Sequence, residues 1–106
     1  MDMPESVKAY FDADKGKDPD LLAKVFSPEA VVHDEGKRHQ GSSAIRKWWL
    51  VAKAKYDHVA EPFETERNGD EISVRAKVSG QFPNSPVTLN YVFLIKGGKV
   101  VEMGVK

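Results

Sequence analysis

The stretch EISVRAKVSGQFPNSPVTLNYVFLIKGGKVV, residues 71–101, decides the fold class. Apolar side chains alternate with polar ones over residues 72–79, and the same alternation returns over residues 87–95 after a proline-containing break. A period of two is typical of a strand that buries one face, and proline does not continue a regular strand. The Gly97-Gly98 pair then turns the chain into another strand. The C-terminal half therefore predicts a sheet of hairpin-linked antiparallel strands.

The N-terminal half has the spacing of helices. The first predicted helix runs from about Pro4 to Gly16, and the second follows the cap and proline pair Asp18-Pro19 as far as Ser27-Pro28. A third begins at the Gly41-Ser42-Ser43 cap. The third helix has an apolar stripe at offsets of three, four, seven and eleven, formed by Ile45, Trp48, Trp49, Ala52 and Tyr56. The first has one face formed by Val7, Tyr10, Phe11 and Asp14.

Between the second and third helices, residues 29–35 are predicted to form a strand and residues 36–41 a polar loop. Helices therefore gather in the first half of the chain and strands in the second. This segregation predicts an α+β fold in which three N-terminal helices pack on a curved, mixed or antiparallel sheet of four to five strands.

Composition limits the classes of function. The 106 residues correspond to one domain, 1–106. The absence of cysteine excludes disulfide scaffolds and thiolate metal sites, and it suits a reducing, cytoplasmic location. Sixteen basic residues balance sixteen acidic ones, so we expect no nucleic-acid partner. We also expect no membrane partner, because the chain has no secretory signal and no apolar run of about 20 residues.

Six segments carry a family resemblance when they are taken in order: residues 7–11, 21–26, 30–36, 41–46, 78–87 and 93–100. Together they resemble the NTF2-like superfamily, and within it the small SnoaL-like proteins related to ketosteroid isomerases and polyketide cyclases. The resemblance implies a cone-shaped half barrel whose helices close a bent sheet over an apolar pocket. Members include isomerases, cyclases, dehydratases, epoxide hydrolases and plain binding modules, so the fold leaves the function open.

Alignment with the ketosteroid isomerases without a gap implies two catalytic residues. Asp34 takes the position of the catalytic base, and Tyr10 takes that of the oxyanion donor. A carboxylate in an apolar pocket can remove a proton from carbon next to a carbonyl, while a phenol stabilises the enolate. Strand parity places Asp34 on the same face as Val32 and places His33 on the opposite face. The alternative is a solvated strand end at Asp34 and an ordinary core tyrosine at Tyr10.

The second donor of these isomerases is a protonated carboxylic acid, and here the alignment reaches Asn90 or Tyr91. Parity predicts that Tyr91 points inward and Asn90 outward. This departure argues against steroid isomerisation itself. An epoxide hydrolase needs an inward arginine between two aspartates, whereas Arg75 lies on the polar side of its strand.

Other side chains are candidates for contact with a ligand. We expect one of Trp48 and Trp49 in the core and the other at the pocket, because adjacent helical residues point about 100° apart. His39 and His58 are candidate proton carriers at the pocket rim, with surface positions as the alternative. Phe82 is a candidate pocket lip or a simple strand bend. The histidines lack metal-ligand spacing, so we expect neither a metal nor a cofactor.

Three hypotheses of function follow. The first is a cofactor-independent isomerase, cyclase or dehydratase that uses Asp34 as its base. The second is a protein that binds an apolar or aromatic metabolite without chemistry, and the third is an assembly module. We also expect a homodimer through the outer sheet face, because Val92 and Leu94 lie on the polar side of their strand, beside Val100 or Val101.

Overall fold

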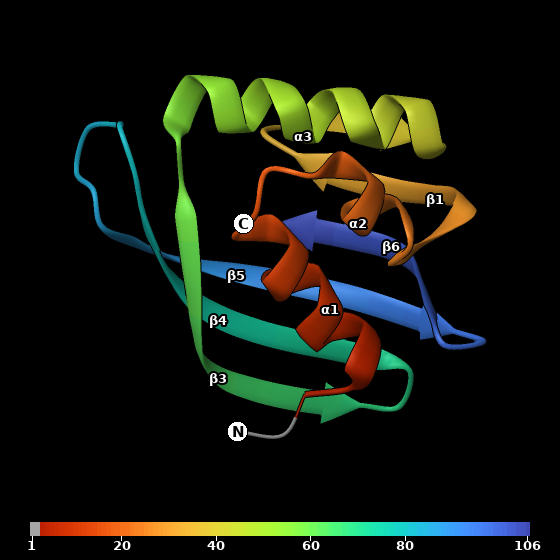
Figure 1. Cartoon of the computed structure of the whole chain (residues 1–106). Helices are drawn as coiled ribbons and strands as arrows, with labels where there is room; N and C mark the ends of the chain where they lie inside the picture. Colours follow the sequence, from red (N-terminus) through yellow and green to blue (C-terminus); the bar gives the residue numbers. More distant parts are fainter. Residues whose placement is uncertain (1–2) are drawn as a thin grey trace.

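The computed structural model describes residues 3–106, which form three α-helices and six β-strands (Figure 1). In chain order the elements are α1 (Glu5–Asp14), α2 (Pro19–Ala23), β1 (Phe26–Asp34), β2 (Lys37–Gln40), α3 (Ser42–Tyr56), β3 (Val59–Asn68), β4 (Glu71–Ser79), β5 (Val87–Lys96) and β6 (Lys99–Val105). The strands form one sheet in the order β2-β1-β6-β5-β4-β3. Pairing is antiparallel between all neighbours except β1 and β6, which run parallel. The sheet is therefore mixed.

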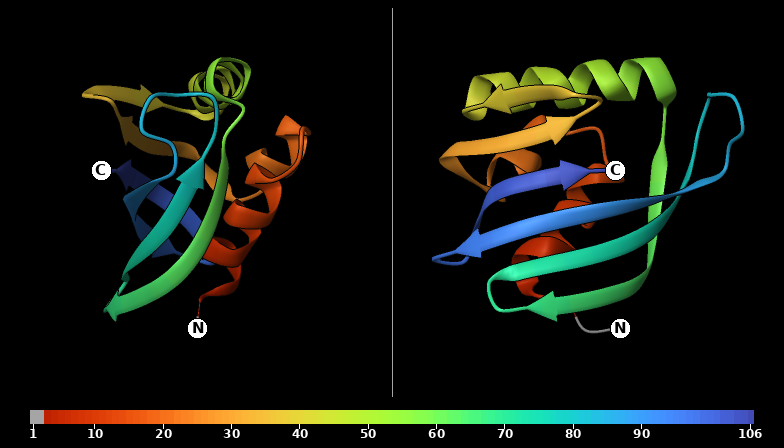
Figure 2. Two further views of the ribbon diagram at one scale, coloured as in Figure 1. Left: turned by 90° about the vertical axis from the view of Figure 1, so that its left-hand side faces the viewer. Right: turned by 180° about the vertical axis from the view of Figure 1, so that it is seen from behind.

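The sheet bends around the helices (Figure 2). Helix α1 lies against its concave face, and α3 runs along the side formed by β1 and β2 (Figure 1). The inward residues of α1, β4, β5 and β6 form the core between these layers, with Val7, Val74, Phe93 and Met103 almost completely buried. The α+β class and the three helices expected from the sequence are confirmed.

The turn between β1 and β2 places the end of β1. Its two residues, Glu35 and Gly36, have φ angles of 52° and 75°, so Asp34 pairs directly with Lys37. A two-residue turn with positive φ at both positions matches the twist of an antiparallel pair. Asp34 is thereby fixed at the last position of β1, on the same face as buried Ala30 and Val32.

Two predictions about the elements are wrong, one on a loop and one on the end of a helix. The polar segment predicted as a loop over residues 36–41 contains strand β2, which brings the sheet to six strands instead of four to five. The second helix ends at Ala23, and β1 begins at Phe26, because Phe26 already pairs with Val100 of β6. Strand β2 shows no hydrophobic repeat, since it is an edge strand held by its backbone bonds to β1.

None of the helices within residues 3–106 is long and apolar enough to cross a membrane.

Candidate functional site

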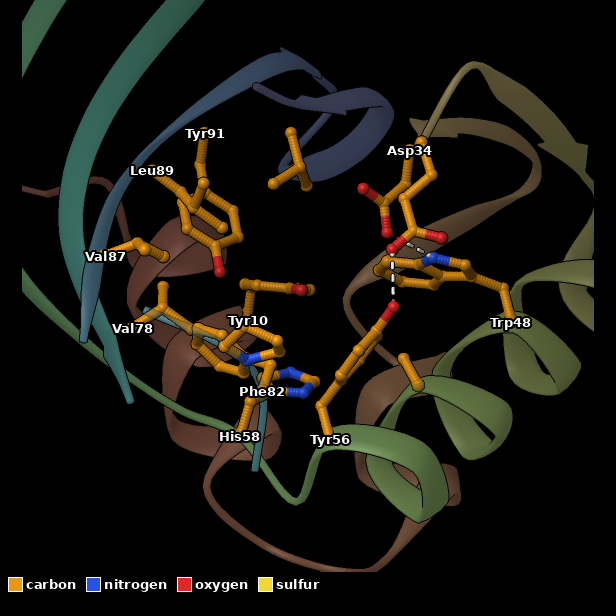
Figure 3. Close-up of a pocket in the computed structure, with 14 residues that line it drawn as sticks. Tyr10, Asp34, Trp48, Tyr56, His58, Val78, Phe82, Val87, Leu89 and Tyr91 are labelled. Atoms are coloured by element: carbon orange, nitrogen blue, oxygen red, sulfur yellow. Dashed lines mark hydrogen bonds between the residues drawn. The ribbon is translucent and has the colours of Figure 1, made fainter. Parts of the chain in front are cut away.

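A half-open pocket of about 360 Å³ lies between the sheet, α1 and α3 (Figure 3). Its volume falls in the range of small-molecule sites. The lining residues are Tyr10, Asp34, Glu35, Trp48, Ala52, Tyr56, His58, Val78, Phe82, Pro83, Val87, Leu89, Tyr91 and Val105. Most of the wall is apolar or aromatic, and its ionisable groups are two carboxylates, three phenols and one imidazole. The pocket therefore combines a small number of polar groups with an apolar surround.

Two hydrogen bonds tie the end of β1 to α3. The indole Nε1 of Trp48 donates to Oδ2 of Asp34 at 3.0 Å, and the hydroxyl of Tyr56 donates to Oε1 of Glu35 at 2.9 Å. Both are drawn as dashed lines in Figure 3. Asp34 is half-buried, and no hydrogen bond within residues 3–106 engages its Oδ1. The carboxylate is thus held in one orientation with an oxygen free to meet a ligand.

Two phenols from opposite layers meet inside the pocket. Tyr10 of α1 is 2% exposed and Tyr91 of β5 is 4% exposed, with ring centroids 6.2 Å apart. Burial, and after it the charge of Asp14, raises the pKa of both hydroxyls, and Asp34 acts in the same direction. Both phenols therefore stay protonated at neutral pH. Each keeps a hydroxyl hydrogen with which to bind a ligand oxygen.

A buried charged cluster lies beneath the pocket. Asp14 is 1% exposed, and its Oδ1 accepts a hydrogen bond from Nε1 of Trp49 at 2.9 Å. The same oxygen lies 3.4 Å from Nζ of Lys53 and 3.5 Å from Nε2 of His58. Burial alone would raise the pKa of Asp14, but the hydrogen bond with His58, the charge of Lys53 and the Trp49 bond together hold it below the ordinary value.

This cluster fixes the position of His58. Lys53 also donates to the backbone oxygen of His58 at 2.7 Å, so α3 holds the backbone of His58 while Asp14 of α1 contacts its imidazole. His58 is largely buried and lines the pocket. An imidazole oriented by a buried carboxylate is suited to carry a proton.

The structure brings together most of the side chains predicted for the site. Tyr10, Asp34, Trp48, His58, Phe82 and Tyr91 all line the pocket. Two predicted ligand contacts lie elsewhere. Trp49 is 1% exposed in the core, where its Nε1 donates to Asp14 of α1, and His39 lies on β2 outside this pocket, with its ring 6.1 Å from that of Trp48. The tryptophan pair divides as expected, with Trp48 at the pocket and Trp49 in the core, so Trp49 is corrected from a candidate ligand contact to a core residue that holds Asp14.

Sequence reasoning missed three polar members of the site. Glu35 and Tyr56 line the pocket, and Asp14 supports His58. Tyr56 was visible as the last member of the α3 stripe, and Asp14 as the acidic member of the α1 face. Each of these side chains contacts a residue that is distant in the sequence, so no sequence pattern indicated the contact.

Among residues 3–106, no group of three or more His, Cys, Asp or Glu side chains is arranged to hold a metal ion.

Comparison with known proteins identifies the family to which this fold belongs. The family model of the SnoaL-like domain matches residues 7–103 of this chain. The chain belongs to the SnoaL-like family. In sequence, no curated protein matches it. A crystal structure of a proposed polyketide cyclase from Sinorhizobium meliloti is 53% identical and has a TM-score of 0.97, with 100% of this chain and 97% of that chain covered.

More distant structures share the fold. A protein from Catenulispora acidiphila with a ketosteroid isomerase-like fold, in complex with trimethylamine, is 20% identical at a TM-score of 0.87, over 99% of this chain and 86% of that one. An epoxide hydrolase/cyclase-like enzyme of pyran ring formation in salinomycin is 23% identical at a TM-score of 0.81, over 95% and 86%. The predicted SnoaL-like family is confirmed, and the expected NTF2-like fold with it.

Proposed function

We propose that this SnoaL-like protein is a cofactor-independent cyclase that removes a proton from carbon next to a carbonyl group in a small, apolar or aromatic polyketide-like molecule. The observation that carries the proposal is the meeting of Asp34 with two phenols that stay protonated, Tyr10 and Tyr91, in one apolar pocket. The 53% identical proposed polyketide cyclase supports the choice of substrate class.

The proposed reaction uses the free oxygen of Asp34 as the base. Asp34 accepts the proton, and the electron pair of the C–H bond moves into the enolate, whose oxygen accepts hydrogen bonds from Tyr10 and Tyr91. The enolate carbon then forms a bond to a second carbonyl carbon of the same molecule. His58, held by Asp14, gives a proton to the resulting alkoxide, and the proton on Asp34 returns to His58 through solvent.

Proton exchange tests this proposal without knowledge of the natural substrate. The probe is 2-tetralone, a bicyclic aromatic ketone with acidic C–H groups, in D₂O, and NMR follows the loss of the α-proton signals. Wild-type protein is expected to accelerate exchange above buffer. Asp34→Asn should lower the protein-dependent rate about 100-fold or more, and Tyr91→Phe about tenfold or more. Asp12→Asn, an exposed α1 carboxylate outside the pocket, is the matched control and should exchange like wild type.

The second candidate is a protein that binds an apolar or aromatic metabolite without chemistry. The hydrogen bond from Trp48 to Asp34 favours it, because a donor that stabilises the ionised carboxylate makes that carboxylate a weaker base. Wild-type protein that binds 2-tetralone, as measured by tryptophan fluorescence, and yet leaves its exchange at the buffer rate would refute the cyclase and support this candidate.

The proposal includes a homodimer through the outer face of the sheet. Val92, Leu94 and Val101 are half-buried on that face, whereas Val100 points into the core and takes no part. Apolar side chains on an outer face are a common dimer surface. Sedimentation of the wild type at micromolar concentration should give a dimer, and Leu94→Lys should give a monomer. A monomeric wild type would contradict this part of the proposal.

A further inference from the structure

A second cavity adjoins the pocket and has the opposite electrostatic character. This outer cavity has a volume of about 390 Å³. It shares part of its wall with the pocket: Asp34, Glu35, Trp48, Ala52 and Tyr56. Its other lining residues are Lys37 and His39 of β2 and Ala44, Lys47, Val51 and Lys55 of α3.

The local geometry explains why basic side chains gather there. Lys37 and His39 pair with Asp34 and Val32, so they share the helix-facing side of the β1–β2 hairpin. On α3, the cavity residues recur at intervals of three and four from Ala44 to Lys55, which makes them one helical face. This face lies beside the one that carries Ile45 and Trp49 into the core.

The lysines of the outer cavity are available for a ligand. Within residues 3–106, none of Lys37, Lys47 and Lys55 forms an ion pair. Lys55 lies 5.0 Å from the centre of the Tyr56 ring, and its interactions with the Tyr56 hydroxyl and then with Glu35 raise its pKa. The two carboxylates of the shared wall already accept hydrogen bonds from Trp48 and Tyr56.

The charge is divided across the shared wall. In the described part of the chain, residues 3–106, no Lys or Arg lines the inner pocket, whereas three ammonium groups and His39 surround the outer cavity. Between the ammonium groups lies an apolar floor that includes the half-buried indole of Trp48 and Val51, which is 56% exposed. Cations around an exposed apolar floor fit a molecule with an acidic group on an apolar body.

We infer that the outer cavity binds an oxyanion, a carboxylate or a phosphate, carried by a small molecule whose apolar body lies against Trp48 and Val51. The carboxylates of Asp34 and Glu35 repel the anion from the shared wall and so direct it toward the lysines. The inference goes beyond the proposed reaction, because it requires no proton transfer at Asp34.

Calorimetric titration with matched probes tests the inference. 2-Naphthoate carries the anion, naphthalen-2-ylmethanol has a similar body without the charge, and 2-naphthyl phosphate offers the other oxyanion. Wild-type protein in 20 mM NaCl is expected to bind naphthoate about tenfold more tightly than the alcohol, and 300 mM NaCl should reduce this preference. Tighter binding of the phosphate ester than of naphthoate would assign a phosphate-bearing ligand, and the reverse order a carboxylate.

A matched pair of double variants locates the site. Lys47→Gln/Lys55→Gln should weaken naphthoate binding about fivefold to tenfold and change the affinity for the alcohol less than about twofold. Lys77→Gln/Lys96→Gln removes the same charge from exposed positions outside both cavities and should bind like wild type.

Equal affinity of the wild type for naphthoate and the alcohol would overturn the inference, as would equal losses in the two double variants. Binding of naphthoate or of the alcohol requires no catalytic reaction. Failure of proton exchange with 2-tetralone would therefore refute the proposed reaction and leave this binding result intact, and the converse also holds.

Discussion

The two neighbouring tryptophans allow a controlled measurement of how much a hydrogen bond to a buried carboxylate contributes to the free energy of unfolding. Trp49→Phe and Trp48→Phe make the same chemical change at adjacent positions, and each removes an indole N–H that donates to a carboxylate. The environments differ. Trp49 and its acceptor Asp14 are each 1% exposed, whereas Trp48 and its acceptor Asp34 are half-buried at the pocket.

The structure sets the size of the expected difference. Oδ2 of Asp14 has no hydrogen-bond partner among residues 3–106, so Trp49→Phe removes one of the few groups that stabilise this carboxylate. Loss of a hydrogen bond to a buried charged group costs about 1.5–3 kcal/mol, and the smaller ring adds about 1 kcal/mol of lost packing. We expect Trp49→Phe to lower the free energy of unfolding by about 3 kcal/mol. Trp48→Phe should cost about 1 kcal/mol or less, because water can reach Asp34.

Urea denaturation followed by circular dichroism measures both values, and thermal melting provides a second measurement. The Trp49→Phe midpoint should fall by about 10 °C or more, against about 5 °C or less for Trp48→Phe. A double-mutant cycle with Asp14→Asn should give a coupling free energy of about 1–3 kcal/mol for the Trp49 pair. Equal losses in the two single variants, or no coupling with Asp14, would refute the assignment of Trp49 to a buried network.

Two further predictions concern stability. Because the pKa of Asp14 is lower in the folded protein, its contribution is present above the pKa of the unfolded chain, about 4, and is lost as the pH falls through the folded value. Between pH 7 and pH 2, the free energy of unfolding measured in urea should therefore fall more steeply for the wild type than for Asp14→Asn, and parallel curves would contradict this. Gly80→Ala should destabilise the protein by about 1–3 kcal/mol, because a Cβ there would lie 2.6 Å from the backbone oxygen of Tyr56. Gly16→Ala, whose Cβ would make an ordinary 3.5 Å contact, is the control and should melt within a few degrees of the wild type.

The elements that the sequence predicted well are those with a strong hydrophobic repeat. The alternation in β4 and β5 and the stripe of α3 each reflect a buried face, so their periods and their inward residues, including Tyr91, could be predicted. Strand β2 has exposed ends and little apolar content. Its stability comes from backbone bonds to β1, which leave no mark on the side-chain pattern.

The candidate site was predictable only in part, for a related reason. Strand parity places Asp34 on the inner face of β1, and the likeness to known enzymes points to Tyr10. Neither of these two arguments indicates which residue contacts a given charged side chain. Asp14 and His58 are 44 positions apart and meet only because α1 packs against the start of β3. Pairings of this kind depend on tertiary structure. Asp14 on an otherwise apolar helical face was nevertheless a visible anomaly, since a buried carboxylate requires a partner.

The parallel pairing of β6 with β1 has a consequence for synthesis on the ribosome. Strand β6 lies between β1 and β5, so the β1–β2 hairpin and the β3–β4–β5 meander have no shared strand until β6 arrives. Asp34 is on the first of these pieces and Tyr91 on the second. Until β6 has left the exit tunnel, the nascent chain therefore holds two sheet fragments that share no strand. Asp34 and Tyr91 can face one pocket only after β6 has paired with both fragments, whatever the order in which the other strands form.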